Sequence, residues 1–377
     1  MNHRQIISTD NTQQVIEKTL TARQWLNVKE EDIPQKTPEY TLRVSAHIPA
    51  QSPAVQDVFE PAFRRLAIMS KGAINVQAFW GGSLHPEREG IKALQSGLTD
   101  LCPVYSAWDA ELFPAAQILS LPFIFDSAEV ATAISEDLYR SYFSQDVEKH
   151  NIYMGRMVAT SEYNLFSRSP IRSLEDLQGQ KIACSNGVES DIFAALGAIP
   201  VGCSTPEAKK QFEENEVFAV SISDSAAQTV GLYKSAKYRT SANLVRVNLE
   251  YGLSKQFWEK LPPPLKSIFN QWLRSLAQAG AQIFYGLAGA RACSIFLDHG
   301  IEFIALSLEE QRRWKEQIKP VESQLLHHLE DLGYPAQQMM QDLLSKAKYY
   351  QTWSANDLMQ ATIVQPLTNI IPMPSNP

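Results

Sequence analysis

The chain has 377 residues, which is enough for two or three domains with a packed core. Hydrophobic residues make up 44% and charged residues 20%, as in soluble globular proteins, and no apolar run is long enough to predict a transmembrane span. The formal net charge of −7 argues against nucleic acid or an anionic membrane surface as the main partner.

The first 40 residues read as a polar N-terminal extension. Aliphatic residues never stand more than two together there, as at Ile6 and Ile7, and charged residues occur throughout. A secretory signal needs an apolar core of roughly 7–15 residues. We therefore expect either that the recorded chain lacks its leader or that the protein stays in the cytoplasm.

Residues 41–105 alternate between strand and helix patterns. Apolar residues at every second position predict strands at 42–46, 74–78 and 101–105. Helical spacing predicts helices at 55–72 and 86–97, the first stopped by a glycine and the second opened by a proline. This β-α-β-α-β order predicts a right-handed parallel sheet.

Aromatic side chains and a histidine follow the ends of these strands. His47, Trp80, Tyr105 and Trp108 stand at or just beyond the carboxyl ends. Ligands of open α/β sheets bind at this edge. An isolated histidine is more often a loop hydrogen-bonder and a tryptophan more often a packing residue, so both interpretations stay open for these positions.

The pattern restarts in residues 161–187, SEYNLFSRSPIRSLEDLQGQKIACSNG. Ser173 and Asp176 have the spacing of a capping box at the start of a short helical turn. Gly179 suits the left-handed position that ends such a turn. A strand follows at 181–184 and runs into Ser-Asn-Gly, so this segment predicts the start of a second α/β unit.

The rest of the chain extends this second unit and then becomes mostly helical. We expect an unusually long strand at 245–253 that crosses between the two units, and tails or loosely packed extensions at 1–38 and 354–377. The other expected elements are strands at 200–203, 217–223 and 301–304 and helices at 188–196, 206–214, 264–299, 307–331 and 336–348.

Several segments in a fixed order are similar to one known family. They are residues 45–59 (SAHIPAQSPAVQDVF), 79–104 (FWGGSLHPEREGIKALQSGLTDLCPV), 119–125 (LSLPFIF), 161–187, 250–262 (EYGLSKQFWEKLP) and 300–321 (GIEFIALSLEEQRRWKEQIKPV). Together with the segments between them, they cover roughly residues 41–350. The chain resembles the substrate-binding proteins of TRAP transporters, the DctP-like family.

The resemblance implies an α/β, two-lobe periplasmic binding protein-like fold with hinge strands and long C-terminal helices. Lobe I would comprise residues 41–160 plus 249–288. Lobe II with its helical cover would comprise 161–248 plus 289–350, and 351–377 would be a C-terminal tail.

The resemblance also implies a function. Such a protein captures a small organic ligand between its lobes by hinge closure and presents it to the membrane permease of a TRAP transporter, without a metal or cofactor. It is not an enzyme and is periplasmic. The alternatives are a cytoplasmic sensor or scavenger on the same fold and, less favoured, an enzyme that uses the cleft, with Cys184 and His47 as a nucleophilic pair.

The family's carboxylate clamp is absent from this sequence. The resemblance implies arginines at the positions of Ala183 and Tyr163, and a side-chain amide near Ser223. An alanine cannot pair a desolvated carboxylate. We therefore expect a neutral, aromatic or weakly polar ligand rather than a simple dicarboxylate, with Arg156 as the best replacement cation.

These arguments give a set of candidate ligand-binding residues. Two of them, Cys184 and Cys203, each follow a short apolar strand, and a disulfide between them stays open because sequence does not show their separation. The full set is His47, Trp80, Tyr105, Trp108, Phe125, Arg156, Tyr163, Ala183, Cys184, Asn186, Cys203, Ser221, Ser223 and Tyr251.

Overall fold

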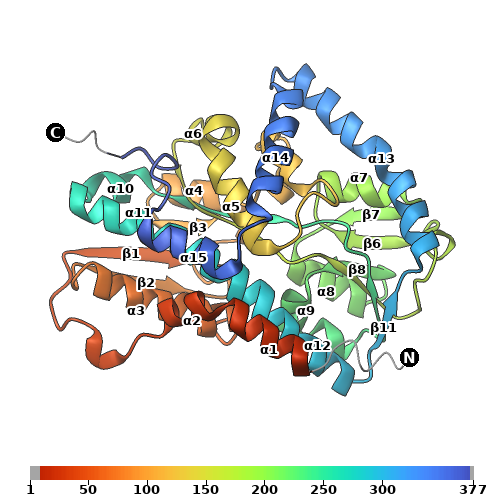
Figure 1. Cartoon of the computed structure of the whole chain (residues 1–377), viewed down its shortest axis with the longest axis horizontal. Helices are drawn as coiled ribbons and strands as arrows, with labels where there is room; N and C mark the ends of the chain where they lie inside the picture. The colour runs from red at the N-terminus through yellow and green to blue at the C-terminus, as the bar shows by residue number, and fades with distance from the viewer. Residues whose placement is uncertain (1–8, 374–377) are drawn as a thin grey trace.

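The computed structural model describes the chain from residue 9 to residue 373, with side chains from residue 13. In this part of the chain the strands form two separate sheets, each covered by helices (Figure 1). The first eight residues of the expected N-terminal extension lie outside the described residues.

The first sheet has parallel strands at one edge and antiparallel ones at the other. Strand β1 pairs in parallel with β2 and β3, as the β-α-β-α-β pattern predicted, whereas β10 pairs antiparallel with β3 and β4. In spatial order the strands are β2 (Ile74–Phe79), β1 (Tyr40–Ser45), β3 (Leu101–Pro103), β10 (Asn248–Leu253) and β4 (Tyr153–Ala159).

The second sheet is built in the same way from the second half of the pattern. Its parallel strands β8, β6 and β7 confirm the predicted strands, whereas β5 pairs antiparallel with both β8 and β9, and β9 pairs in parallel with β11. The spatial order is β11 (Glu302–Ala305), β9 (Tyr238–Ser241), β5 (Asn164–Ser167), β8 (Ala219–Ile222), β6 (Lys181–Cys184) and β7 (Ile199–Gly202).

Helices cover both sheets and confirm the helices predicted at 55–72, 86–97, 188–196 and 206–214, whereas those within 106–148, at 224–230 and at 255–260 were not predicted. In lobe I they are η3 (Val55–Phe59), α3 (Glu60–Met69), η4 (Glu87–Glu89), α4 (Gly90–Gln95), η5 (Ser106–Trp108), η6 (Ala115–Ser120), α5 (Ala128–Leu138), η7 (Tyr139–Phe143), α6 (Ser144–Glu148) and α10 (Lys255–Lys260). In lobe II they are η8 (Leu174–Leu177), α7 (Val188–Ala195), α8 (Thr205–Glu213), α9 (Asp224–Val230) and η9 (Leu232–Lys234).

Two extended segments and one long helix connect the lobes. The backbone N–H of Tyr163 donates to Val245 O at 3.0 Å and that of Thr160 donates to Val247 O at 2.9 Å, so the two extended crossings lie side by side. The predicted strand at 245–253 is wrong for residues 245–247, because these belong to the crossing and the strand begins at Asn248.

The helical connection is continuous from Pro263 to Asp298. It begins as α11 (Pro263–Ala279), passes through the π-helical segment η10 (Gly280–Ala288) and continues as α12 (Gly289–Asp298). Helix α11 packs on β4 of lobe I, and α12 packs on α9 of lobe II. One helix therefore spans both lobes.

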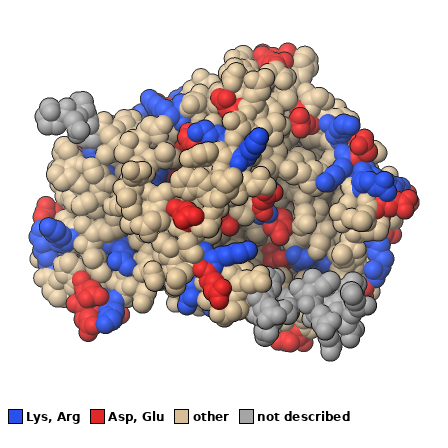
Figure 2. All heavy atoms as spheres, viewed as in Figure 1, with Lys and Arg blue, Asp and Glu red and all other residues tan. Residues whose placement is uncertain are grey.

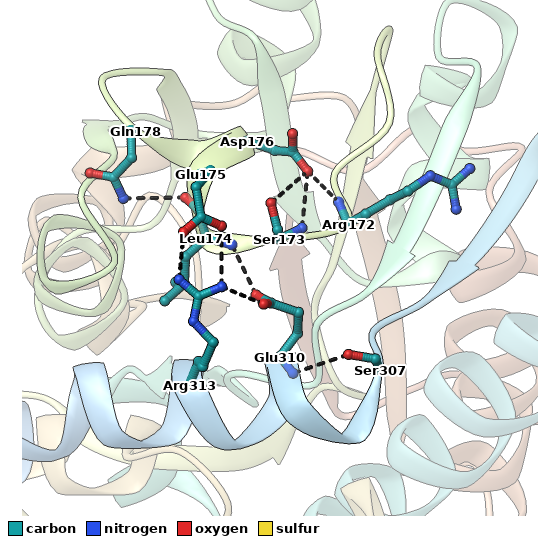
Figure 3. A network of polar contacts seen from close by, with 9 residues as sticks. All are labelled: Arg172, Ser173, Leu174, Glu175, Asp176, Gln178, Ser307, Glu310 and Arg313. Atoms are coloured by element: carbon teal, nitrogen blue, oxygen red, sulfur yellow. Dashed lines mark hydrogen bonds and ion pairs between the residues drawn. The ribbon is translucent and has the colours of Figure 1, made fainter.

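A polar network joins the segment before β6 to the C-terminal cover (Figure 3). Ser173 and Asp176 form the predicted capping box of η8, and Gly179 has the predicted left-handed backbone, with φ +69°. Helix α13 (Leu308–Asp331) reaches this segment through Glu310, which accepts the backbone N–H of Leu174 at 3.0 Å. This contact attaches the cover to lobe II.

Both ends of the described chain pack on the rest of the protein, contrary to the expectation of loose tails. Helices α1 (Thr9–Lys18), α2 (Leu20–Leu26) and α15 (Ala355–Val364) lie against the long helix, and α2 also lies against α3 (Figure 1). Trp25 and Met359 are buried in the core, and so are Ile370 and Ile371. The polar residues of these segments lie on their outer faces.

The remaining cover helices are α14 (Ala336–Tyr350) and η2 (Glu30–Asp32). On the face shown in Figure 2, Lys and Arg side chains are intermixed with Asp and Glu. Within residues 9–373, no helix combines the length and the apolar character that a membrane span requires.

Candidate functional site

A cavity of about 270 Å³ lies between the two lobes. Lobe I contributes residues that follow β1 and β3, lobe II contributes the starts of α8 and α9, and the middle of the long helix closes one wall. We call it the aromatic cavity after the rings that line it, which are His47, Phe59, Tyr105, Trp108, Tyr163, Tyr251, Phe284 and Tyr285.

Half of the predicted site residues line this cavity. They come from distant parts of the chain, and the lobe crossing brings them together. They are His47, Tyr105, Trp108, Arg156, Tyr163, Ser223 and Tyr251. Contact between these residues and a ligand stays a prediction.

Two predicted aromatic residues serve as packing instead. Trp80 stacks on Phe63 with ring centres 6.1 Å apart and planes 10° apart, on the far side of Phe59 from the cavity. Phe125 is buried, and its backbone oxygen accepts the Nε–H of Arg246 at 3.2 Å. Neither side chain lines the aromatic cavity.

Residues of strands β6 and β8 also lie away from the cavity. Ala183 is fully buried in the core of lobe II, so its methyl group packs among side chains rather than facing a ligand. Ser221 donates its hydroxyl hydrogen to the buried carboxylate of Glu189. The site predicted at these positions is therefore occupied by core packing and an internal hydrogen bond.

Asn186 contributes to the cleft in another way. Its Nδ2 donates to the backbone oxygen of Trp108 at 3.1 Å, which links the loop after β6 to lobe I. This contact holds the two lobes against each other at the edge of the aromatic cavity. Asn186 does not itself line the cavity.

Cys184 ends strand β6, and Cys203 directly follows the paired strand β7. The backbone N–H of Cys203 donates to Cys184 O at 3.0 Å, yet both thiols are free. Burial raises the pKa of the Cys184 thiol, with a further contribution from the carboxylate of Glu189. A reactive cysteine needs the opposite shift, and Cys184 lies outside the cavity that His47 lines.

The wall formed by lobe I is a set of edge-to-face contacts. The rings of Tyr105 and Trp108 are 4.6 Å apart at 64°, and His47 meets Tyr105 edge-on at 5.8 Å. His47 Nδ1 lies 2.6 Å from Glu87 Oε1, which fixes the imidazole from behind. Such contacts hold the rings in defined orientations.

The tyrosines of the cavity are neutral hydrogen-bonding groups. Burial raises the pKa of Tyr105 well above its ordinary value, and burial also raises the pKa of Tyr163 and Tyr251. The positive charge of Arg156 partly offsets this shift for Tyr105 and Tyr251. At neutral pH these hydroxyls therefore stay protonated and are able to donate to a ligand.

Arg156 brings a positive charge into this aromatic surrounding. It comes from β4 and is only 4% exposed. Its Cζ lies 4.3 Å from the ring centre of Tyr251 and 4.9 Å from that of Phe59. The cavity therefore combines an apolar wall with one buried cation.

Residues on helices form the part of the site that the sequence did not reveal. Phe59 belongs to a π-helical turn whose apolar spacing indicated only a core face, and Phe284 and Tyr285 belong to η10. A π-helical turn is frequent at functional sites. Its presence depends on hydrogen-bond register and leaves no periodic signal in the sequence.

A second cavity of about 520 Å³ lies on the other side of Tyr285, which lines both. Both arginines that line it already have carboxylate partners. Arg239 holds Asp224 through two hydrogen bonds of 2.9 and 2.7 Å, and Arg246 lies 2.9 Å from Glu162. Half of the predicted site residues line the aromatic cavity and none lines this one, so we take the aromatic cavity as the candidate site.

Metal ions in proteins need a set of ligand side chains that lie close together. Among the residues described, no three His, Cys, Asp or Glu side chains lie close enough together to hold an ion. The arrangement is suited to enclosing a small molecule by apolar contact, ring stacking and a few polar groups.

Comparisons with known proteins agree with this geometry. The family model described as bacterial extracellular solute-binding protein, family 7, matches residues 44–327, which is more than half of the chain. The C4-dicarboxylate-binding protein DctB of Bacillus subtilis is 24% identical over 257 residues, covering 67% of this chain and 73% of DctB.

Two solved structures show the same fold. A TRAP solute-binding protein from Rhodoferax ferrireducens, in complex with copurified benzoate, has a TM-score of 0.77 at 18% identity, covering 82% of this chain and 98% of its own. A marine metagenome TRAP protein specific for aromatic acid ligands, with 3-hydroxybenzoate, has a TM-score of 0.78 at 18% identity, covering 84% and 100%. The chain described here belongs to family 7 of the bacterial extracellular solute-binding proteins, the TRAP substrate-binding proteins, as the sequence match and the two-lobe fold show.

Proposed function

We propose that this protein is the ligand-capturing receptor of a TRAP transporter. The observation that carries the proposal is a cavity of about 270 Å³ whose wall is shared by both lobes. A ligand in this position contacts both lobes at once, so its binding favours the closed arrangement.

The connections between the lobes are suited to a hinge. The two extended crossings are short and lie side by side, held by the hydrogen bonds of Tyr163 with Val245 and of Thr160 with Val247. The hydrogen bond from Asn186 to Trp108 lies away from these crossings in sequence and joins the lobes directly. Opening would break this contact and leave the crossings intact.

The ligand that this cavity favours is a small aromatic molecule. Eight rings line its wall, and the two solved relatives carry benzoate and 3-hydroxybenzoate. DctB is named for C4-dicarboxylates, but Arg156 is the one arginine among the described lining residues of the cavity, which leaves none for the second carboxylate of such a ligand. We do not retain the expectation of a neutral ligand, because Arg156 lines the cavity.

The receptor would act outside the cytoplasm, in the periplasm, and deliver its ligand to a membrane permease. The match to an extracellular solute-binding family supports this location. Fractionation of the native cells tests it, because recovery of the protein with cytoplasmic markers would favour the sensor or scavenger alternative. No catalytic step is proposed.

A ligand screen tests the proposal as a whole. The purified chain is screened by thermal shift against a library of small organic acids, amides and alcohols, and the ligands that bind are examined by small-angle X-ray scattering. We expect at least one class to raise Tm and to reduce the radius of gyration. The proposal fails if no compound binds, if binding leaves the radius unchanged, or if a bound compound is turned over.

A further inference from the structure

Arg156 differs from the other buried arginines of this protein in having no carboxylate partner. Within residues 13–373, the arginines less than 9% exposed are Arg156, Arg239 and Arg274. Arg239 lies 2.7 Å from Asp224 and Arg274 lies 2.6 Å from Glu136. No Asp or Glu oxygen of the described chain lies within 4.0 Å of the Arg156 guanidinium, and its buried Nε has no hydrogen-bond partner there.

An unpaired buried guanidinium is costly, because it gives up hydration for five N–H donors. The rings of Phe59 and Tyr251 offset part of this cost through cation–π contact. The hydroxyl of Tyr251 also interacts with the guanidinium, but the Nε–H of Arg156 has no acceptor in the described chain. The group therefore retains unused donors at the cavity wall.

A β-bulge sets the direction of this side chain. Arg156 is paired with Tyr251 and Met154 with Gly252, so Gly155 is an extra residue in β4. A Cβ on Gly155 would lie 2.8 Å from Tyr251 O and 2.6 Å from Leu101 Cδ1, so only glycine fits this position. The extra residue changes the alternation of β4, and Arg156 and Val158 both line the cavity.

Buried groups fix the bulge from behind. Arg274 donates to the backbone oxygen of Gly155, and the carboxylate of Glu136 accepts the backbone N–H of Met157 at 3.4 Å. The same two side chains form an ion pair. Both neighbours of Arg156 in the strand are therefore held, and its guanidinium is preorganised before a ligand arrives.

The opposite wall leaves room for the guanidinium. A Cβ on Gly280 of the long helix would lie 3.3 Å from Arg156 Nη1, tighter than an ordinary contact. The nearest other cation of the cavity, Lys209, already pairs with Glu213 at 2.7 Å. The cavity thus offers one free positive group and a large ring surface.

We propose that Arg156 binds the carboxylate of an aromatic monocarboxylic acid, whose ring lies against the aromatic wall of the cavity. This assignment rests on the proposed receptor function and names its substrate class. A guanidinium pairs a carboxylate through two parallel hydrogen bonds, which sets both affinity and orientation. Lys209, the other Lys or Arg among the described lining residues, is paired with Glu213, so a second carboxylate would be buried without a free cation and we expect dicarboxylates to bind weakly.

Calorimetry on the full chain with three probes tests the assignment. The probes are benzoate, its neutral isostere benzamide, and succinate. Removing a hydrogen bond to a charged group weakens binding by about 10- to 150-fold. We expect benzoate to bind at least about 10-fold more tightly than benzamide and succinate, which is the lower end of that range.

Two arginine variants distinguish the effect of losing a cation in the cavity from the effect of losing one elsewhere in the protein. Arg156→Met removes the charge and should make benzoate no better than benzamide. Arg168→Met is the matched control, because Arg168 also stacks on a ring, 4.0 Å from the centre of Phe212, but lines neither cavity. It should change benzoate affinity by less than about twofold, because Arg168 does not line the cavity.

The outcomes distinguish this assignment from the receptor function. Equal binding of benzoate and benzamide by the wild-type chain, tighter binding of succinate, or unchanged benzoate affinity in Arg156→Met would each overturn the assignment, while a ligand-binding receptor would remain. If Arg156→Met does not fold by circular dichroism, the wild-type comparison still decides. Arg156→Lys then provides a second variant, expected to bind benzoate with intermediate affinity because lysine keeps the charge and loses the fork.

Discussion

The ion pair of Arg274 and Glu136 should be a major stabilising element of lobe I. Their side chains are 1% and 3% exposed, and Nη1 lies 2.6 Å from the carboxylate. In Arg274→Met the carboxylate of Glu136 remains buried with only the backbone N–H of Met157 as a donor, and Gly155 O loses its partner. Removing one partner of a buried pair costs about 3–5 kcal/mol. We expect a loss of that size in the free energy of unfolding.

Urea unfolding followed by circular dichroism measures this loss. An exposed ion pair provides the matched control: Lys319 and Glu316 lie 3.6 Å apart on α13 and are each 75% exposed. Lys319→Met should change stability by less than about 1 kcal/mol, because exposed pairs contribute little. Both variants replace one cation with methionine, so the difference between them isolates burial.

A double variant refines the reasoning. Replacing both charges by apolar residues removes the uncompensated carboxylate, and such exchanges are often close to neutral. Glu136→Met combined with Arg274→Met should therefore recover most of the stability that Arg274→Met loses. A single-variant loss below about 1 kcal/mol, or a double variant as unstable as the single one, would refute the argument.

Further predictions concern a buried acid, the C-terminal helix and the thiols. Burial raises the pKa of Glu250 from 4.5 to about 7. Between these two pH values the folded protein keeps a proton that the unfolded chain releases. The free energy of unfolding therefore falls as pH rises from 4.5 to about 7, by up to about 1.4 kcal/mol per pH unit. Glu250→Gln should make stability depend less on pH in urea titrations at pH 5 to 8. An unchanged dependence on pH would contradict the raised pKa of Glu250. Met359→Ala should cost about 2–5 kcal/mol because Met359 is fully buried, whereas Val364→Ala, at a position 64% exposed, should cost under about 0.5 kcal/mol; equal losses would mean that α15 is not docked in solution. Cys184 and Cys203 should resist the thiol reagent DTNB until the chain unfolds, since burial raises the pKa of both, to about 11 for Cys203, and rapid labelling of the folded protein would revive the nucleophile interpretation.

Local patterns predicted much of the architecture correctly. The alternation in residues 42–46 and the capping-box spacing of Ser173 and Asp176 depend on neighbours within a few positions, and the structure confirms both. The ends of the chain were predicted wrongly because the burial of Met359 depends on helices more than 70 residues away. Composition within the segment does not contain that information.

The residues of the candidate site also fall into those that local patterns predicted and those that they did not. Residues that follow strand ends, such as His47 and Tyr105, line the cavity because strand ends meet at one edge of a sheet. Ala183 and Cys184 do not, because their expected place came from resemblance along the strand, and their side chains are held in the core. Arg156 could be named from the sequence only as a possible substitute, since its direction depends on the bulge at Gly155.

The number of residues in the π-helical segment η10 helps to set the orientation of the two lobes relative to each other. Helix α11 before it packs on lobe I and helix α12 after it packs on lobe II. Each residue of an α-helix turns the chain by about 100°, so deleting one residue from 280–288 would rotate the packing face of α12 by roughly that angle relative to α11. Insertions and deletions here would therefore reshape the ligand cleft more than most substitutions, and family members that differ by one residue in this helix should differ in specificity.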